Sequence, residues 1–148
     1  MNPEEKKLIA EATKSLKLVD IILYESRFSR PSDMPDEVEK LSSLVKRGAS
    51  YSIDSVDEAE VLSVKTEFGV RLTDVESNPE EADVFIEIEA DYIVQYELLN
   101  TLSDECLSAF SEFNGVHNTW PFWRQHVLDL VQRGHLPPIV IPLFSGDE

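Results

Sequence analysis

The sequence predicts an α+β fold, a four-stranded antiparallel sheet with helices packed on one face. Between Leu16 and Leu98, apolar and polar residues alternate in several runs, which is typical of strands. After Ser103 the apolar residues recur every three or four positions, which is typical of helices. Short links between consecutive strands favour antiparallel pairing, and 148 residues are the usual length of one domain. We therefore expect a single domain over residues 1–148.

A first helix is predicted from Pro3 to about Ser15. Asn2 suits the N-cap and Pro3 the first helical position, while Glu4 and Glu5 favour the positive end of the helix dipole. Apolar residues then follow at helical spacing: Leu8, Ile9, Ala12 and Leu16.

The next segment, Leu16–Ser29, is predicted to be a long strand with two apolar faces. One parity carries Leu18, Ile22, Tyr24 and Phe28, and the other carries Val19, Ile21 and Leu23. A strand in a sheet with one solvated face does not have this pattern. The second apolar face therefore needs a cover, which is either another layer or another copy of the protein.

The middle of the chain is expected to hold a short helix followed by a short strand. Pro31 and Pro35 interrupt regular structure. A short helix is predicted over Asp36–Arg47, because four apolar residues would share one side of it: Val38, Leu41, Leu44 and Val45. A short strand is predicted over Ala49–Ile53, where apolar and polar residues alternate.

Two further strands are predicted over Ala59–Thr73 and residues 82–98. In the former, one side is apolar: Leu62, Val64, Phe68, Val70 and Leu72. In the latter, the even positions from Val84 to Tyr96 are apolar, while the odd ones include Asp83, Glu87, Glu89, Asp91 and Glu97. We expect these carboxylates to form an acidic outer face, with no sequence neighbour placed to shift their pKa.

The last third of the chain is predicted to be helical before an extended tail. Ser103 suits the N-cap of a helix that would end at Asn114-Gly115. A second helix is expected to begin near Thr119, with Trp120 and Trp123 on its buried stripe, and to end at Arg133-Gly134. Residues 135–148, rich in proline and apolar side chains, should run extended over the surface.

Charge and composition limit the partners and the compartment. The chain has 29 Asp and Glu against 13 Lys and Arg, a formal charge of −16, which disfavours nucleic acid and anionic membranes. It suits solubility or attraction to basic segments. No apolar run approaches the roughly 20 residues of a membrane span. Charges near the N-terminus argue against a signal peptide, and the single cysteine allows no internal disulfide. We expect a cytoplasmic protein.

No pattern in the sequence is typical of an enzyme. The five glycines form no phosphate-binding loop, and His117, His126 and His135 match no common spacing of metal ligands. Cys106 could act as a nucleophile, but a small buried residue is also expected at that point of an amphipathic helix. We therefore expect no catalytic residue, metal or cofactor. The remaining apolar surface implies association with other chains.

The segment WPFWRQHVLDLVQRGHLPPIVIPLF resembles the SecB family of export chaperones. The family has an aromatic-Pro-aromatic element, a helix with an early Arg, a V-x-R-G sequence, and an apolar residue and Pro before an extended tail. The corresponding residues here are Pro121-Phe122, Arg124, Val131-Gln132-Arg133-Gly134, Leu136 and Pro137. The upstream run LSAFSEFN, Leu107–Asn114, resembles the family's preceding helix. Over Leu16–Glu97 the similarity is one of topology.

The resemblance implies an ATP-independent chaperone that binds unfolded or non-native polypeptides and assembles as a dimer of dimers. Its clients would be preproteins, with hand-off to the export ATPase SecA, or a dedicated client such as an antitoxin. Residues expected in a client-binding groove are Ile22, Tyr24, Phe28, Tyr51, Phe113 and Trp120. Residues expected to dock a basic partner segment are Glu25, Glu87 and Glu89.

Two departures from the family and two other function classes stay open. The charged N-terminal helix over residues 1–15 would be an addition, and the family's C-terminal helix would be missing or reduced after Phe144. The main alternative is an acidic adaptor, not a chaperone, that uses the same fold to bind a folded basic protein. A hydrolase that uses Cys106 or the histidines is the third possibility.

Overall fold

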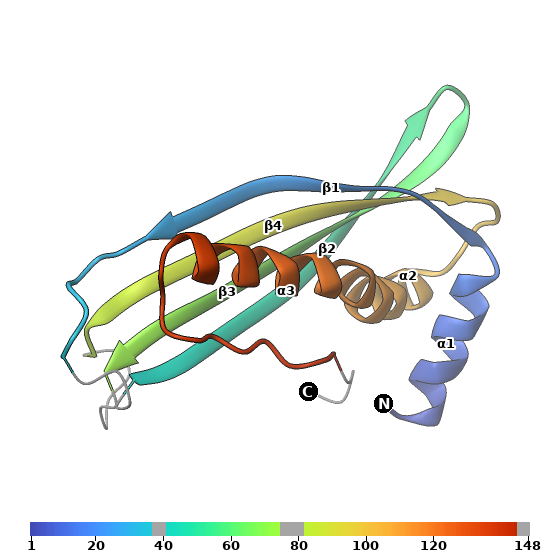
Figure 1. Cartoon of the computed structure of the whole chain (residues 1–148). Helices are drawn as coiled ribbons and strands as arrows, with labels where there is room; N and C mark the ends of the chain where they lie inside the picture. The colour runs from blue at the N-terminus through green and yellow to red at the C-terminus, as the bar shows by residue number, and fades with distance from the viewer. Residues whose placement is uncertain (37–40, 75–81, 145–148) are drawn as a thin grey trace.

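The computed structural model describes residues 1–36, 41–74 and 82–144. Within these residues four strands form one antiparallel sheet in the order β1-β4-β3-β2 (Figure 1). The strands are β1 (Leu16–Ser29), β2 (Leu41–Val56), β3 (Ala59–Asp74) and β4 (Val84–Leu98). The helical segments are α1 (Pro3–Thr13), α2 (Asp104–Phe110), the π-helical η2 (Ser111–Gly115) and α3 (Val116–Arg133). The predicted fold class is confirmed.

The N-terminal helix and the first strand follow the predicted pattern. The Asn2 side chain accepts a hydrogen bond from the backbone N–H of Glu5 at 2.8 Å, which caps α1. β1 has the predicted bounds and forms one edge of the sheet, paired with β4 alone. Both of its faces stay largely exposed within this chain.

β2 begins earlier than the sequence predicts and replaces the helix expected over Asp36–Arg47. Residues 37–40 lie outside the described part, but Leu41–Arg47 is strand and pairs with β3. The helix prediction rested on apolar residues at a spacing of three or four. Pairing with β3 continues without interruption to Leu41 opposite Asp74, so tertiary hydrogen bonding overrides that local pattern.

The core lies between the sheet and the helical layer. As predicted, β3 and β4 turn one apolar face toward the helices: Leu62, Val64, Phe68, Val70 and Leu72 from β3, and Ile86, Ile88, Ala90, Tyr92, Val94 and Tyr96 from β4 are buried. From α3, Trp123 and Val127 are fully buried against this face. The Phe68 ring stacks on Trp123, with 5.6 Å between ring centroids.

The expected break between two helices at Asn114-Gly115 is wrong. The chain stays helical through η2 into α3, which begins at Val116, three residues before the predicted start. A Cβ on Gly115 would lie 2.6 Å from Cγ1 of Val64, so this glycine permits close packing of helix on sheet. One wide π-helical turn at this contact lets the helix continue.

Residues 136–144 are extended as predicted, but the expectation that the tail lies over the surface is wrong, because part of it is packed into the core. Leu136 N–H donates to the Val131 carbonyl at 3.0 Å and turns the chain back along α3 (Figure 1). Leu136, Ile139 and Ile141 are buried in the core beside α3. The helical layer is therefore completed by an extended segment. No helix among the described residues is long and apolar enough to cross a membrane.

Candidate functional site

Two β-bulges in β1 distribute its predicted groove residues over both faces of the sheet. Pairing with β4 shifts between Leu18 and Asp20 and again between Leu23 and Glu25. Phe28 lies opposite Ile88, on the helical side of the sheet. In a regular strand, residues of one parity would all lie on the same face of the sheet. The bulges break this rule in β1, so residues of one parity lie on different faces.

Ile22 and Tyr24 lie on the outer face, away from the helices. Ile22 is opposite Ile93, whose side chain belongs to the outer parity of β4. The Lys65 ammonium lies 5.5 Å above the Tyr24 ring, and Lys65 also points outward from β3. These two residues are separated by the sheet from the other predicted groove residues.

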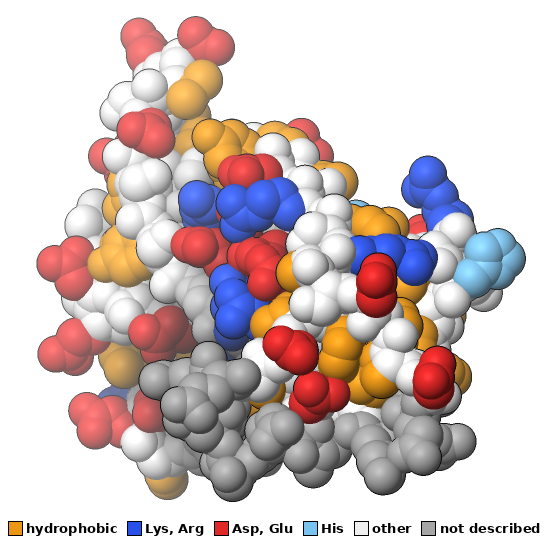
Figure 2. Space-filling view, turned by 90° about the vertical axis from the view of Figure 1, so that its left-hand side faces the viewer, with side chains coloured by type: hydrophobic (Ala, Val, Ile, Leu, Met, Phe, Trp, Pro, Cys, Tyr) orange, Lys and Arg blue, Asp and Glu red, His pale blue; other side chains and the backbone are white. Residues whose placement is uncertain are grey.

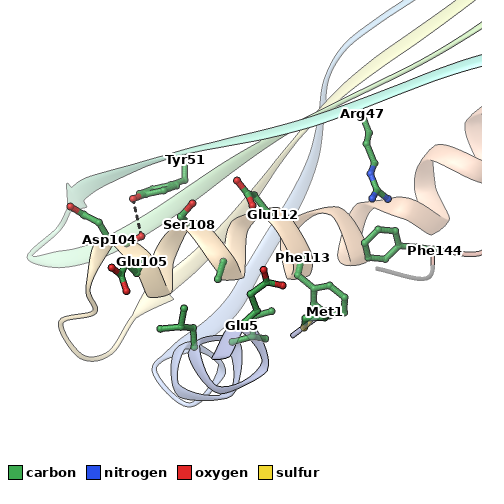
Figure 3. Close-up of a pocket in the computed structure, with 13 residues that line it drawn as sticks. Met1, Glu5, Arg47, Tyr51, Asp104, Glu105, Ser108, Glu112, Phe113 and Phe144 are labelled. Carbon is green, nitrogen blue, oxygen red and sulfur yellow. Dashed lines mark hydrogen bonds between the residues drawn. The ribbon is translucent and has the colours of Figure 1, made fainter. Parts of the chain in front are cut away.

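A groove of about 630 Å³ lies on the helical side, between α1, α2, η2 and the edge strand β2 (Figure 3). Its apolar lining is formed by Met1, Leu8, Ile9, Tyr51, Ala109, Phe113 and Phe144. The Tyr51 hydroxyl donates to the Asp104 carbonyl at 3.5 Å and joins β2 to the start of α2. Of the predicted groove residues, Tyr51 and Phe113 line this groove.

Carboxylates surround the apolar lining of the groove. Glu5 from α1 and Glu112 from η2 face the same space, and Asp104 and Glu105 stand at the start of α2 (Figure 3). Positive charge among the lining residues comes from the Arg47 side chain and the amino terminus of Met1. The groove is thus apolar at its base and acidic at its rim, a combination that favours apolar segments flanked by basic side chains.

Four rings gather at the end of the groove nearest the tail. The Phe113 ring stacks on His117 with an interplanar angle of 6°. The Phe144 ring lies 5.6 Å from Phe113 and 5.6 Å from Trp120, measured between centroids. The Arg47 guanidinium carbon lies 4.9 Å from the centre of the Phe144 ring. Phe144 therefore occupies a site built from β2, η2 and α3.

Trp120 lies beneath the groove and is 6 % exposed. Its Nε1 donates to the Pro142 carbonyl at 2.7 Å, and its ring packs edge-on against Phe68. The sequence interpretation, in which Trp120 belongs to a buried stripe, agrees with this position. Trp120 is not among the residues that line the groove, but its ring contacts that of Phe144, which does line it.

The three predicted docking carboxylates lie together on the outer face, each beside a cation. Arg71 Nε lies 2.9 Å from Glu87, and Arg27 lies 3.5 Å from Glu25. Glu89 accepts from Arg27 at 2.9 Å and from Lys46 at 2.8 Å. Figure 2, which views the molecule from the left-hand side of Figure 1, shows Lys and Arg side chains intermixed with Asp and Glu side chains on that side. The carboxylates expected to meet a basic partner are thus paired within the chain.

The expectation that no sequence neighbour shifts the pKa of these carboxylates is wrong for Glu89, and the pKa values of both Glu89 and Asp91 are shifted. The hydrogen bond from Lys46 is the main cause that lowers the pKa of Glu89 to about 2. Asp91 lies opposite Glu25 and Glu67, and burial, followed by the charge of Glu67, raises its pKa. Lys46 lies on β2 and Glu67 on β3, where sequence proximity does not reveal them, whereas Glu87, the second cause that lowers the pKa of Glu89, lies two residues away on β4.

The residues weighed for catalysis lie apart from one another. Cys106 belongs to α2 and is buried in the core. His117 stacks in the ring cluster, and burial lowers the pKa of His126 on α3. His135 follows α3 with a positive φ of 52°. Across residues 1–36, 41–74 and 82–144, no group of three or more His, Cys, Asp or Glu residues could hold a metal ion.

Sequence reasoning did not single out Leu8, Ile9 or Arg47 as groove residues, and it indicated Phe144 only through the extended tail that contains it. Leu8 and Ile9 were assigned to the packing of α1, and Arg47 to a helix that does not form. The sequence signal for Phe144 was the apolar composition of the tail. A large apolar side chain near the end of an extended segment is expected to pack against another part of the protein. The groove itself depends on long-range packing, which no local pattern encodes.

No family model matches the sequence, and no curated protein matches it. The structure is similar to that of a SecB-like chaperone from Mycobacterium tuberculosis, solved in complex with a ChAD peptide from the HigA1 antitoxin. The TM-score is 0.75 at 16 % sequence identity, and the alignment covers 94 % of this chain and 97 % of that chain. The chain therefore has a SecB-like fold.

Proposed function

We propose that this protein is an ATP-independent chaperone, not an enzyme, that binds unfolded or non-native polypeptide segments in the groove between α1, α2, η2 and β2. The observation that carries the proposal is the open apolar groove lined by Tyr51 and Phe113. Burial of apolar surface is not directional, so such a groove accepts many sequences. The SecB-like fold and the chaperone named for its neighbour support this function.

The client is a polypeptide in an extended or disordered state. The neighbour's complex contains a peptide from an antitoxin, which supports a dedicated client of that kind for this chain as well. A preprotein awaiting export is the other client that fits the same chemistry. Either client would meet the protein in the cytoplasm, before folding or before transport.

We further propose that the protein assembles with copies of itself, as a dimer of dimers. The edge strand β1 exposes large apolar side chains on both faces: Leu18, Val19, Ile22, Leu23, Tyr24 and Phe28 are 38–60 % exposed. An unpaired edge strand with this composition favours pairing with another chain. A second copy would cover the apolar face for which this chain provides no cover.

Docking of SecA or another basic partner at Glu25, Glu87 and Glu89 would require exchange of existing ion pairs. Arg27, Lys46 and Arg71 are at least half exposed, and exposed ion pairs contribute only about 0–1 kcal/mol each. A cationic segment that makes several contacts at once could therefore displace them. The chain's charge of −16 would assist its approach.

The test combines light scattering with aggregation of a reduced, unfolded protein in the absence of ATP. We expect a multimer that forms a complex with the unfolded protein but not with its native form. Tyr51→Ala and Phe113→Ala should each weaken binding about 5- to 30-fold, the usual effect of truncating an aromatic anchor. Phe122→Ala, which removes a half-exposed aromatic ring of α3 that does not line the groove, is the matched control and should bind as the unaltered protein does.

A complex with the native form of a basic protein, combined with no effect on unfolded chains, would favour the acidic adaptor instead. Equal losses in all three variants would place the client elsewhere than in the groove.

A further inference from the structure

We infer that the end of the tail, Pro142–Phe144, occupies a peptide-binding site, and that a client segment must displace it. The site continues the groove over η2 and α3, and it recognises an extended apolar segment with an aromatic side chain. This inference rests on the proposed function, because it assigns the groove a competitor from within the same chain.

The hydrogen bonds that hold the tail here are accepted by its backbone carbonyl groups and do not involve its side chains. Trp120 Nε1 donates to the Pro142 carbonyl at 2.7 Å, and Arg124 Nε donates to the Ile141 carbonyl at 2.9 Å. Every extended polypeptide offers carbonyl groups in this way. When the tail beyond Ile141 is displaced, Arg124 keeps its bond to Ile141, and Trp120 Nε1 becomes free to donate to a carbonyl of another extended segment.

The aromatic site at the end of the groove is filled by Phe144 alone among the described tail residues. Its ring meets Phe113, His117 and Trp120 at centroid distances of 5.6, 6.1 and 5.6 Å. Phe144 also lines the open groove directly. An aromatic side chain of a client that enters from the groove would reach the same rings.

The tail divides into an anchored part and a weakly held part. Ile139 and Ile141 are 8 % and 5 % exposed within the core, whereas Leu143 is 77 % exposed. Among the described residues, no backbone–backbone hydrogen bond joins the tail to another element after the one made by Leu136. Displacement beyond Ile141 therefore breaks the Trp120 hydrogen bond and the contacts of one ring, and it leaves the core in place.

Competition predicts the opposite result from a role of Phe144 as a groove wall. If the tail occupies the client's site, Phe144→Ala frees the site and strengthens client binding. If the ring only supports the client, the same change weakens binding. Leu143→Ala is the matched control, because it removes a neighbouring large apolar side chain that points into solvent.

The experiment measures the affinity of three full-length proteins, the unaltered chain, Phe144→Ala and Leu143→Ala, for two fluorescent probes. One probe is reduced, carboxamidomethylated α-lactalbumin, which stays unfolded. The other is a synthetic peptide with the sequence of residues 136–148. We expect Phe144→Ala to bind both probes at least about threefold more tightly than the other two proteins, as expected for loss of one set of ring contacts.

Equal or weaker binding by Phe144→Ala overturns the inference. Tighter binding of the tail peptide alone, with no protein binding α-lactalbumin, would retain the tail site and reject the chaperone function. Failure of both probes with all three proteins rejects both. Circular dichroism of each variant checks that its fold and melting temperature are retained.

Discussion

Lys46 Nζ lies 2.8 Å from a carboxylate oxygen of Glu89, although a whole strand separates the two residues. Gly69 of β3 lies opposite both, and a Cβ there would stand 2.5 Å from Cε of Lys46. The missing side chain is what lets Lys46 cross β3. Arg27 reaches Glu89 from the other edge strand at 2.9 Å, so one carboxylate of β4 links both edges of the sheet.

This arrangement predicts acid-sensitive stability. The pKa of Glu89, lowered from 4.5 to about 2, favours the ionised form in the folded state. Its contribution is therefore present above pH 4.5 and is lost as the pH falls toward 2. We expect Glu89→Gln to lower the free energy of unfolding at pH 7 by on the order of 1 kcal/mol, because its cationic partners are largely exposed.

Urea unfolding between pH 2 and pH 7 measures this difference, which should disappear near pH 2. Glu97→Gln is the control, since Glu97 makes no ion pair with a described residue. A difference between Glu89→Gln and the unaltered protein that does not vary with pH would show that the ion pairs do not cause it.

A second prediction concerns the contact between η2 and β3. Gly115→Ala should destabilise the protein by roughly 1–3 kcal/mol, because the new Cβ would lie 2.6 Å from Val64 in a packed core. Better helix propensity offsets at most about 1 kcal/mol of this. Thermal unfolding of Gly115→Ala, Val64→Ala and the double variant tests the mechanism. If crowding between the two side chains causes the loss, the double variant should lose less stability than the two single variants lose together.

The two neighbouring aromatic residues of α3 should differ sharply in their effect on stability. Trp123 is fully buried and Phe122 is 51 % exposed. We expect Trp123→Ala to cost about 3–5 kcal/mol, the usual range for emptying a core site of this size. Phe122→Ala should change stability by no more than about 0.5 kcal/mol. Chemical denaturation of both variants provides the comparison, and similar losses would contradict the assignment of faces on α3.

Cys106 offers a test of the enzyme alternative. Cys106→Ala removes one buried sulfur atom, so we expect a loss of stability on the order of 1–2 kcal/mol and unchanged affinity for unfolded polypeptide. Affinity and unfolding are measured on the same preparation. A catalytic cysteine would behave differently, since its removal would abolish an activity while stability changed little.

The sequence predicted elements where the local pattern and the long-range pairing agree. The bounds of β1 follow from its run of apolar residues at both parities, and the buried parity of β3 follows from alternation. The bulges of β1 depend on pairing with β4, so they separated Phe28 from Ile22 and Tyr24 against expectation. At Leu41 a local helical spacing and a long-range strand pairing conflict, and pairing prevails.

The candidate site was predictable only in part, because four distant segments build it. Tyr51 and Phe113 carried a signal, as aromatic residues in a chain with surplus apolar surface. Glycine is common at helix ends, so the sequence indicated a helix end at Gly115. Its close contact with Val64 explains why a glycine is found inside the helix instead. Phe144 lies beside Phe113 because the tail folds back along α3. The residues next to Phe144 in the sequence do not determine that fold.

The strand order also sets a sequence of events during synthesis. β2 and β3 are joined by a tight turn and can pair as soon as both leave the ribosome, but Leu16 at the start of β1 pairs with Leu98 at the end of β4. At about 5–20 residues per second, β1 waits several seconds for its partner strand. During that interval it presents an extended apolar segment to the cell. The nascent chain thus passes through the very state that we propose its folded form to recognise in others.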